Sequence, residues 1–342
     1  MNAKRWVAVG IAVALFIFSG ITAGLTKKET KETDELSSIN ALLYGSNQLS
    51  ETVLEDGSSS NKIAKIQVEG TITGGSGGLF STETYNHEEL LDQIQAIKKS
   101  PSIKAVLLEV NTPGGGVYES AELARALQEL QQDKKIPIYV SMKNMAASGG
   151  YYISAHADKI FATQETVTGS IGVIMSSLNY SGLLEKLGVE DATVKSGALK
   201  DMGSGTRPET KEEEEVLQAY IDSAYNRFVG IVSEGRKMSE EEVKKIADGR
   251  IYDGQQALDA GLIDEIGFPD EALKALRKDY GLEDAQYVQY SVKSSGFAST
   301  WLGAKLAQIQ GLQPSESSQV QALLKSIGTS EAPKAMYYYG GE

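Results

Sequence analysis

The distribution of hydrophobic residues divides the chain into an apolar N-terminal run, a polar segment and a long region of alternating short apolar runs. Residues 6–25 contain no charged side chain and consist mostly of Val, Ala, Ile, Leu and Phe. At about 1.5 Å per residue, such a helix is roughly 30 Å long, which matches the hydrocarbon core of a bilayer. The apolar core of a cleavable signal peptide is shorter, about 7–15 residues. We therefore predict that residues 6–25 form an uncleaved transmembrane anchor after a short cytosolic N-terminus, residues 1–5.

The next segments predict a polar stalk followed by an α/β domain. Residues 26–61 are rich in Ser, Glu and Thr, which is typical of a stalk. Strand-like runs at Lys62–Ile72, Ile103–Val110 and Ile138–Val140 alternate with helical patterns, the first of which starts at Asn86. This alternation predicts parallel strands joined by helices that cover both faces of the sheet. We expect the domain to span residues 62–290.

The end of the chain shows weaker periodicity. Residues 291–342 are expected to be loosely attached, and the aromatic run Met336–Tyr339 has no evident partner strand. An exposed apolar run of this kind suggests one further hypothesis: the tail occupies, or is trimmed by, a peptide groove of the same protein.

Composition excludes several classes of function. The net charge of −13 argues against nucleic-acid binding, which needs basic patches. The chain has no cysteine and only two histidines, His87 and His156, so disulfides, thiol chemistry and a histidine-based zinc site are not expected. The sequence predicts neither a metal nor a cofactor.

Two glycine-rich turns follow predicted strands, Pro113–Gly116 and Ser148–Gly150. Ligands of open α/β sheets bind at these strand ends, and glycines leave backbone N–H groups free to form an oxyanion hole. Neither turn has the pattern of a phosphate-binding loop, although tight turns that simply need glycine remain an alternative. Ser148 is the candidate nucleophile here, and the alternative role for it is a helix N-cap.

A nucleophilic serine needs a base, and the histidines are poorly placed to supply one. His156 would lie about 12 Å from Ser148 along the same helix, and His87 is expected at the surface. A Ser–Lys dyad remains, in which burial lowers the lysine pKa enough to leave it neutral. Spacing does not choose among the candidate bases, although Lys200 is flanked by small residues; the candidates are Lys143, Lys159, Lys195 and Lys200.

Five ordered motifs make the chain resemble the S49 family of serine peptidases, in its single-repeat Gram-positive signal peptide peptidase form. The resemblance covers about residues 62–290 and the N-terminal anchor. The motifs are Asn111–Thr–Pro–Gly–Gly–Gly–Val–Tyr–Glu–Ser120, Met145–Ala–Ala–Ser–Gly–Gly–Tyr–Tyr–Ile153, Thr168–Gly–Ser–Ile–Gly–Val173, Lys195–Ser–Gly–Ala–Leu–Lys–Asp–Met–Gly–Ser204, and Gly249–Arg–Ile–Tyr–Asp–Gly254 continuing to Gly261–Leu–Ile–Asp–Glu–Ile–Gly267.

The resemblance implies a Clp-protease/crotonase-like fold of repeated ββα units and hydrolysis of remnant signal peptides. It places the nucleophile at Ser148, the general base at Lys200 and a lysine-orienting serine at Ser170. The oxyanion donors would be the N–H of Gly149 and that of Gly114 or Gly115. It also implies a homo-octamer in which the serine and the lysine come from neighbouring subunits, on a single-pass bacterial membrane protein with its catalytic domain outside the cytoplasm.

The chain departs from the family pattern at two places. Thr112 replaces a serine before Pro–Gly–Gly, and Ser204–Gly–Thr–Arg207 replaces Ser–Pro–Phe–Arg. Two other functions compete with peptide hydrolysis. A crotonase-like acyl-CoA enzyme would use a similar oxyanion hole without a serine nucleophile, and a non-catalytic membrane scaffold would use the fold only for assembly.

Overall fold

The computed structural model describes residues 49–74, 85–292 and 334–340. The predicted anchor at residues 6–25 and most of the predicted stalk lie outside these ranges. Among the residues that are described, no helix is both long and apolar enough to cross a membrane.

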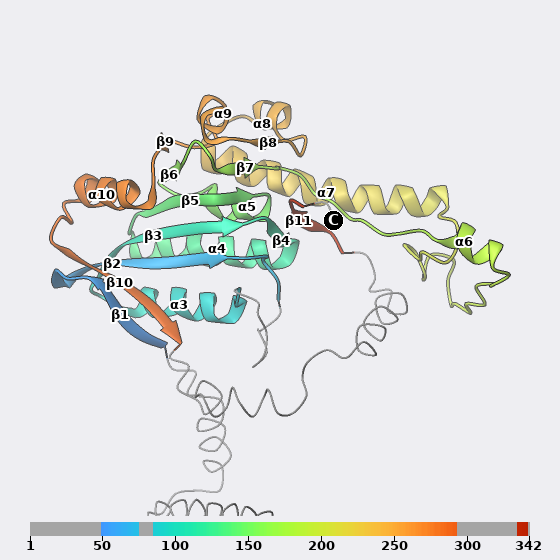
Figure 1. Cartoon of the computed structure of the whole chain (residues 1–342), viewed down its shortest axis with the longest axis horizontal. Coiled ribbons are helices and arrows are strands. Elements are labelled where there is room, and N and C mark those ends of the chain that lie inside the picture. The colour runs from blue at the N-terminus through green and yellow to red at the C-terminus, as the bar shows by residue number, and fades with distance from the viewer. Residues whose placement is uncertain (1–48, 75–84, 293–333, 341–342) are drawn as a thin grey trace, which may run out of the picture. The chain divides into compact units, whose positions relative to one another are not determined.

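A mostly parallel sheet forms the centre of the fold, as predicted (Figure 1). Its strand order is β1-β10-β2-β3-β5-β6-β9, with β7 beside β5 and β8 beside β7. Only the pairs β1–β10 and β7–β8 of this sheet are antiparallel. The strands are β1 (Leu49–Glu55), β2 (Ser58–Glu69), β3 (Ile103–Thr112), β5 (Ile138–Ala147), β6 (Lys159–Ala162), β7 (Val167–Gly169), β8 (Ile251–Tyr252), β9 (Glu265–Ile266) and β10 (Ala285–Val292).

Helices cover both faces of this sheet because its central strands are apolar on both sides. Along β2, Ala64 and Ile66 face one core while Ile63 faces the other. The first core is covered by α3 (His87–Lys99), α4 (Val117–Lys134), α5 (Gly149–Ser154) and the C-terminal half of α7 (Lys211–Arg236). The second is covered by α10 (Pro269–Tyr280). The short helices α8 (Glu240–Ile246) and α9 (Gly254–Asp259) complete the described fold.

The predicted stalk ends earlier than expected. Residues 49–61 belong to β1 and β2, so the boundary at residue 61 is wrong. The strand β1 pairs antiparallel with β10 at the edge of the sheet, and most of its side chains are exposed. An edge strand with polar, exposed side chains lacks the apolar pattern of a buried strand, which explains the error.

Residues 334–340 are also more firmly packed than predicted. The strand β11 (Met336–Tyr338) pairs antiparallel with β4 (Gly114–Gly116), so the aromatic run does have a partner strand (Figure 1). Tyr337 is only 1% exposed and stacks on Tyr152, with ring centroids 4.9 Å apart. Burial of the Tyr337 ring stabilises the pairing of β11 with β4.

An outlying segment, residues 175–208, connects β7 to α7 and contains α6 (Ser181–Lys186). We call it the arm. In Figure 1 the end of the arm that carries α6 lies far from α5, at the opposite end of α7. Leu183 of α6 and Leu187 at its C-cap are 58% and 67% exposed rather than packed on the body.

Candidate active site

Ser148 lies in a strained turn between β5 and α5. Its backbone has φ 53° and ψ −113°, a conformation that residues with a side chain rarely adopt. Its N–H donates to the Gly169 carbonyl at 2.8 Å, and the residue is 1% exposed. Ser148 does occupy the N-cap position of α5, but its side chain makes no capping hydrogen bond to the described residues of that helix. Strain held in this way is common where a side chain serves chemistry.

The glycine loop of β4 lies directly against this turn. A Cβ on Gly114 would collide with the Tyr337 carbonyl oxygen and lie 2.5 Å from the Gly149 nitrogen. Gly114 also has φ 98°, so this position requires glycine for two reasons. Its N–H donates to the Thr112 side-chain hydroxyl at 3.0 Å. Because threonine keeps the hydroxyl of serine, the departure from the family pattern at residue 112 is conservative.

The backbone of β4 leaves Gly115 turned towards β11. The Gly114 carbonyl accepts from Ile72 N–H at 2.8 Å, and Gly116 N–H donates to the Ile72 carbonyl at 2.9 Å. Since alternate residues of a strand point their backbone groups to opposite sides, the N–H of Gly115 faces the other neighbour, β11. Gly114 N–H is bonded to Thr112, whereas the N–H of Gly115 faces Tyr337, its partner in the register.

The tail strand occupies the space between the two glycine turns. Tyr337 lies opposite Gly115 in the antiparallel register. Its carbonyl oxygen packs against Gly114 and lies 3.1 Å from where a Cβ on Gly149 would be. An extended peptide therefore places a carbonyl beside the residue that follows Ser148.

Ser170 follows the end of β7, next to the residue that accepts the Ser148 N–H. Its φ is 48°, its own N–H donates to the Arg250 carbonyl at 2.8 Å, and it is 7% exposed. A groove of about 590 Å³ starts at Ser170 and runs past Tyr338 and Tyr339 of the tail. The structure thus places Ser170 next to the Ser148 turn, and the groove leaves open space beside Ser170.

The four candidate lysines differ in their partners. Lys143 lies 3.9 Å from Glu69, Lys195 lies 2.5 Å from Asp201, and Lys159 pairs with Glu265. The hydrogen bond that Lys159 donates to the Glu265 carboxylate raises the pKa of Lys159, which makes it a poorer base.

Lys200 forms no ion pair among the residues described by the structure, and it is exposed on the arm. The arm extends away from α5 (Figure 1). Within one chain the structure therefore joins Ser148, Ser170 and the glycine turns, and it does not bring Lys200 to them.

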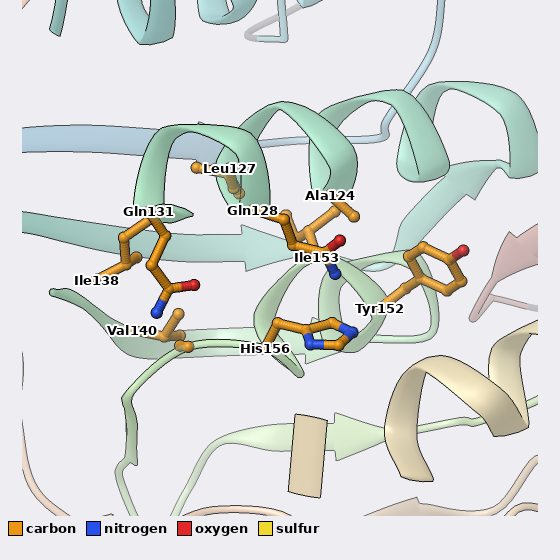
Figure 2. A pocket seen from close by; sticks show the side chains of 10 residues that line it. Ala124, Leu127, Gln128, Gln131, Ile138, Val140, Tyr152, Ile153 and His156 are labelled. Carbon is orange, nitrogen blue, oxygen red and sulfur yellow. The ribbon is translucent and has the colours of Figure 1, made fainter. Parts of the chain in front are cut away.

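His156 lies in a different place from the one expected. The helix α5 ends at Ser154, so His156 is beyond it rather than on the same helix. It lines a cavity of about 10 Å³ between α4 and the sheet, beside Gln128 and Ile153 (Figure 2). Its Nε2 is buried and has no hydrogen-bond partner within residues 49–74, 85–292 and 334–340, and burial lowers the pKa of His156. The conclusion that it does not serve Ser148 stays a prediction.

His87 was predicted to lie at the surface, but the structure buries it. It is 6% exposed, and its Nδ1 lies 2.6 Å from the Tyr85 hydroxyl. Its Nε2 lies 3.0 Å from the Glu122 carboxylate on α4. Both ring nitrogens are therefore engaged in fixing the start of α3 to α4. In the described part of the chain, no group of three or more histidine or carboxylate side chains could hold a metal ion.

Comparison with known proteins identifies the family. The model of peptidase family S49 matches residues 130–283. A putative signal peptide peptidase SppA of Enterococcus faecium is 52% identical over 344 residues, covering 100% of both chains. A putative protease of Methanocaldococcus jannaschii is 41% identical over 218 residues, covering 64% of this chain and 70% of the relative.

Among solved structures, a ClpP1 mutant from Listeria monocytogenes aligns with 61% of this chain and 94% of its own, with a TM-score of 0.40 and 18% identity. That likeness is too weak to add to the assignment. The full-length similarity to the Enterococcus faecium relative and the matching family model are sufficient to assign the family without it. The chain belongs to the signal peptide peptidases of family S49 and is a serine peptidase.

Proposed function

We propose that this protein is a membrane-anchored endopeptidase that uses a Ser148–Lys200 dyad to degrade remnant signal peptides and other small or unfolded peptides. The observation that carries the proposal is the pairing of β11 with β4. An extended segment lies antiparallel on Gly114–Gly116, with the Tyr337 carbonyl between Gly114 and Gly149. A substrate peptide would add to the same strand through its backbone.

In the proposed reaction, neutral Lys200 accepts the Ser148 hydroxyl proton while Ser148 Oγ attacks the peptide carbonyl carbon. The resulting oxyanion accepts hydrogen bonds from the N–H groups of Gly149 and Gly115. Gly115 is preferred to Gly114 because the Gly114 N–H is already bonded to Thr112. Protonated Lys200 then gives its proton to the leaving amine, and the C–N bond breaks to leave an acyl-enzyme. Water attacks this ester by the reverse sequence and releases Ser148.

The lysine would come from a second copy of the chain. Lys200 is exposed on an arm that extends away from its own Ser148 turn, and the groove beside Ser170 leaves room for an incoming side chain. The arm also exposes Leu178 and Val194, at 86% and 99%, which favours self-association. A contact of this kind would take Lys200 out of water, which favours the neutral form that a general base requires. The position of Lys200 on the arm supports a ring-shaped homo-oligomer, and we propose that this oligomer is an octamer.

Substrate class and location follow from the relative and from the sequence. The Enterococcus faecium protein carries the name of a signal peptide peptidase, and we extend that substrate class to this chain. The apolar run at residues 6–25 supports a single-pass anchor, which would hold the catalytic domain at the outer face of the bacterial membrane. Remnant signal peptides lie in that membrane.

Cleavage of a synthetic signal peptide by the full-length protein in detergent tests the proposal. We expect the Ser148→Ala and Lys200→Ala variants to lose activity by more than roughly a thousandfold, as nucleophile and base variants do. Lys186→Ala is the matched control, since Lys186 is another exposed lysine of the arm, and it should keep full activity. A Lys200→Ala protein that keeps most of its activity would overturn the dyad. An acyl-CoA thioester tested in parallel should not be hydrolysed, whereas a crotonase-like enzyme would act on it. If the wild-type protein cleaves no peptide, the non-catalytic membrane scaffold would be favoured instead.

A further inference from the structure

Ser120 contributes a buried hydroxyl that no other feature of the fold explains. It lies on α4, four residues after the glycine loop, and it is 0% exposed. None of the residues that the structure describes forms a hydrogen bond with its Oγ. A buried hydroxyl without a partner lowers stability, so its presence calls for an explanation outside folding.

The position of this hydroxyl points to the oxyanion site. Ser120 Oγ lies 2.6 Å from the point that a Cβ on Gly149 would occupy. The Tyr337 carbonyl oxygen of the bound tail lies 3.1 Å from the same point. The hydroxyl and the peptide carbonyl thus approach Gly149 from the same side. No hydrogen bond joins Ser120 to Tyr337 in the described structure.

We propose that Ser120 is a positioning residue of the oxyanion site. Its Oγ packs against Gly149 and holds the N–H of that residue in place. Its O–H dipole is free to turn towards the carbonyl oxygen as negative charge develops there. Ser120 and Gly149 are both buried, so a dipole here acts strongly on that charge. Because the interaction grows only when the carbonyl becomes an oxyanion, it should raise kcat and leave KM unchanged.

The chain offers a matched control for the loss of a buried hydroxyl. Ser141 on β5 is also 0% exposed, and its Oγ likewise has no hydrogen-bond partner in the described part of the chain. It lies in the strand interior opposite Phe161 of β6, six residues before the Ala147–Ser148 turn. Replacing either serine by alanine removes one unpartnered hydroxyl from the interior, so the two variants should have similar effects on stability.

The inference rests on the proposed peptidase function, and kinetics of the full-length protein on a signal peptide test it. We expect Ser120→Ala to lower kcat about tenfold, less than the roughly hundredfold cost of losing a direct oxyanion donor, with KM unchanged and Tm unchanged or higher. Ser120→Cys, which keeps a weak donor of similar size, should recover part of the loss. Ser141→Ala should match wild type in kcat.

A peptidyl aldehyde, which forms a tetrahedral adduct with a serine nucleophile, provides the second readout. Ser120→Ala should weaken binding of the aldehyde about tenfold relative to wild type. The matching peptide amide, which forms no adduct, should bind Ser148→Ala and the double variant Ser148→Ala/Ser120→Ala equally well. Equal kcat and aldehyde affinity in Ser120→Ala and wild type would overturn the role of Ser120 and leave the peptidase intact. If wild type neither cleaves the peptide nor binds the aldehyde, both the peptidase function and the role of Ser120 fall.

Discussion

At the scale of single residues, backbone strain distinguishes Ser148 from an ordinary serine at a helix start. The sequence shows small residues around it, but not that its φ is positive. The strain persists because the Ser148 N–H is bonded to Gly169 and the following glycine packs against Gly114. These contacts fix the hydroxyl at the site at the expense of stability.

This strain predicts the order of stability of two inactive variants. Ser148→Gly and Ser148→Ala both remove the hydroxyl, but only glycine adopts φ 53° without strain. We expect the free energy of unfolding of Ser148→Gly to exceed that of Ser148→Ala by about 1 kcal/mol in chemical denaturation. At Ser154, inside α5, the order should reverse because glycine is unfavourable in a helix. Equal stabilities for the two Ser148 variants would contradict the strain.

At the scale of elements, the arm is tied to α7 by one arginine. Arg207 donates to Asp201 at 2.8 Å and to Glu213 at 2.9 Å. The hydrogen bonds from Arg207 lower the pKa of Glu213 from 4.5 to about 2, and they also lower that of Asp201. A lowered carboxylate pKa stabilises the folded arm above pH 4.5, and this contribution is lost as the pH falls towards 2. Although residues Ser204–Arg207 differ from the family pattern, Arg207 still holds this loop in a defined conformation beside Lys200.

We expect Arg207→Met to loosen the arm without unfolding the body. Hydrogen exchange should accelerate in residues 189–206, and peptidase kcat should fall about tenfold or more because Lys200 is no longer held in place. The Tm should change by only a few degrees. Arg125→Met is the control, since Arg125 is exposed on α4 and lies 3.8 Å from its partner Glu129. Unchanged exchange in the arm would contradict the anchoring role.

The tail strand predicts self-inhibition. Because β11 occupies β4, a substrate must displace it, and a tethered competitor acts at about millimolar effective concentration. Truncation after residue 333 should raise kcat/KM for a short peptide about tenfold, mainly by lowering KM. Tyr337→Phe, which loses the hydrogen bond to the Ala224 carbonyl but keeps the strand pairing, should have a smaller effect. A truncated protein with unchanged kcat/KM and a Tm several degrees lower would show that β11 is purely structural.

Trimming of the tail is a separate question that mass spectrometry answers. If the site cleaves its own tail, wild type should lose C-terminal residues that Ser148→Ala retains. Identical C-termini in the two proteins would remove this idea and leave self-inhibition untouched.

At the scale of the whole molecule, the sequence predicted the parallel sheet but neither its edge strand β1 nor the separate pairing of β11 with β4. Central strands such as β3 are apolar on both faces, and that pattern is visible without a structure. The edge strand β1 and the tail strand β11 are missed because one is polar and the other pairs with three glycines, which have no side-chain pattern. Spacing alone could not select Lys200, because within one chain its position is unrelated to Ser148.

The same separation predicts that two inactive variants rescue each other. In mixed assemblies of Ser148→Ala and Lys200→Ala, about a quarter of the sites would combine an intact serine from one copy with an intact lysine from another. Co-expression of the two variants should therefore restore about a quarter of wild-type peptidase activity. Activity no higher than that of either variant alone would indicate that both residues come from one chain, or that the chain does not assemble.

Covalent labelling of the nucleophile tests the central claim most directly. The full-length protein is treated with a fluorophosphonate, digested and mapped by mass spectrometry. We predict a single adduct on Ser148, slower labelling in Lys200→Ala because the base is missing, and no adduct in Ser148→Ala. An adduct on any other serine, or labelling of Ser148→Ala at the wild-type rate, would contradict the assignment of Ser148 as the nucleophile.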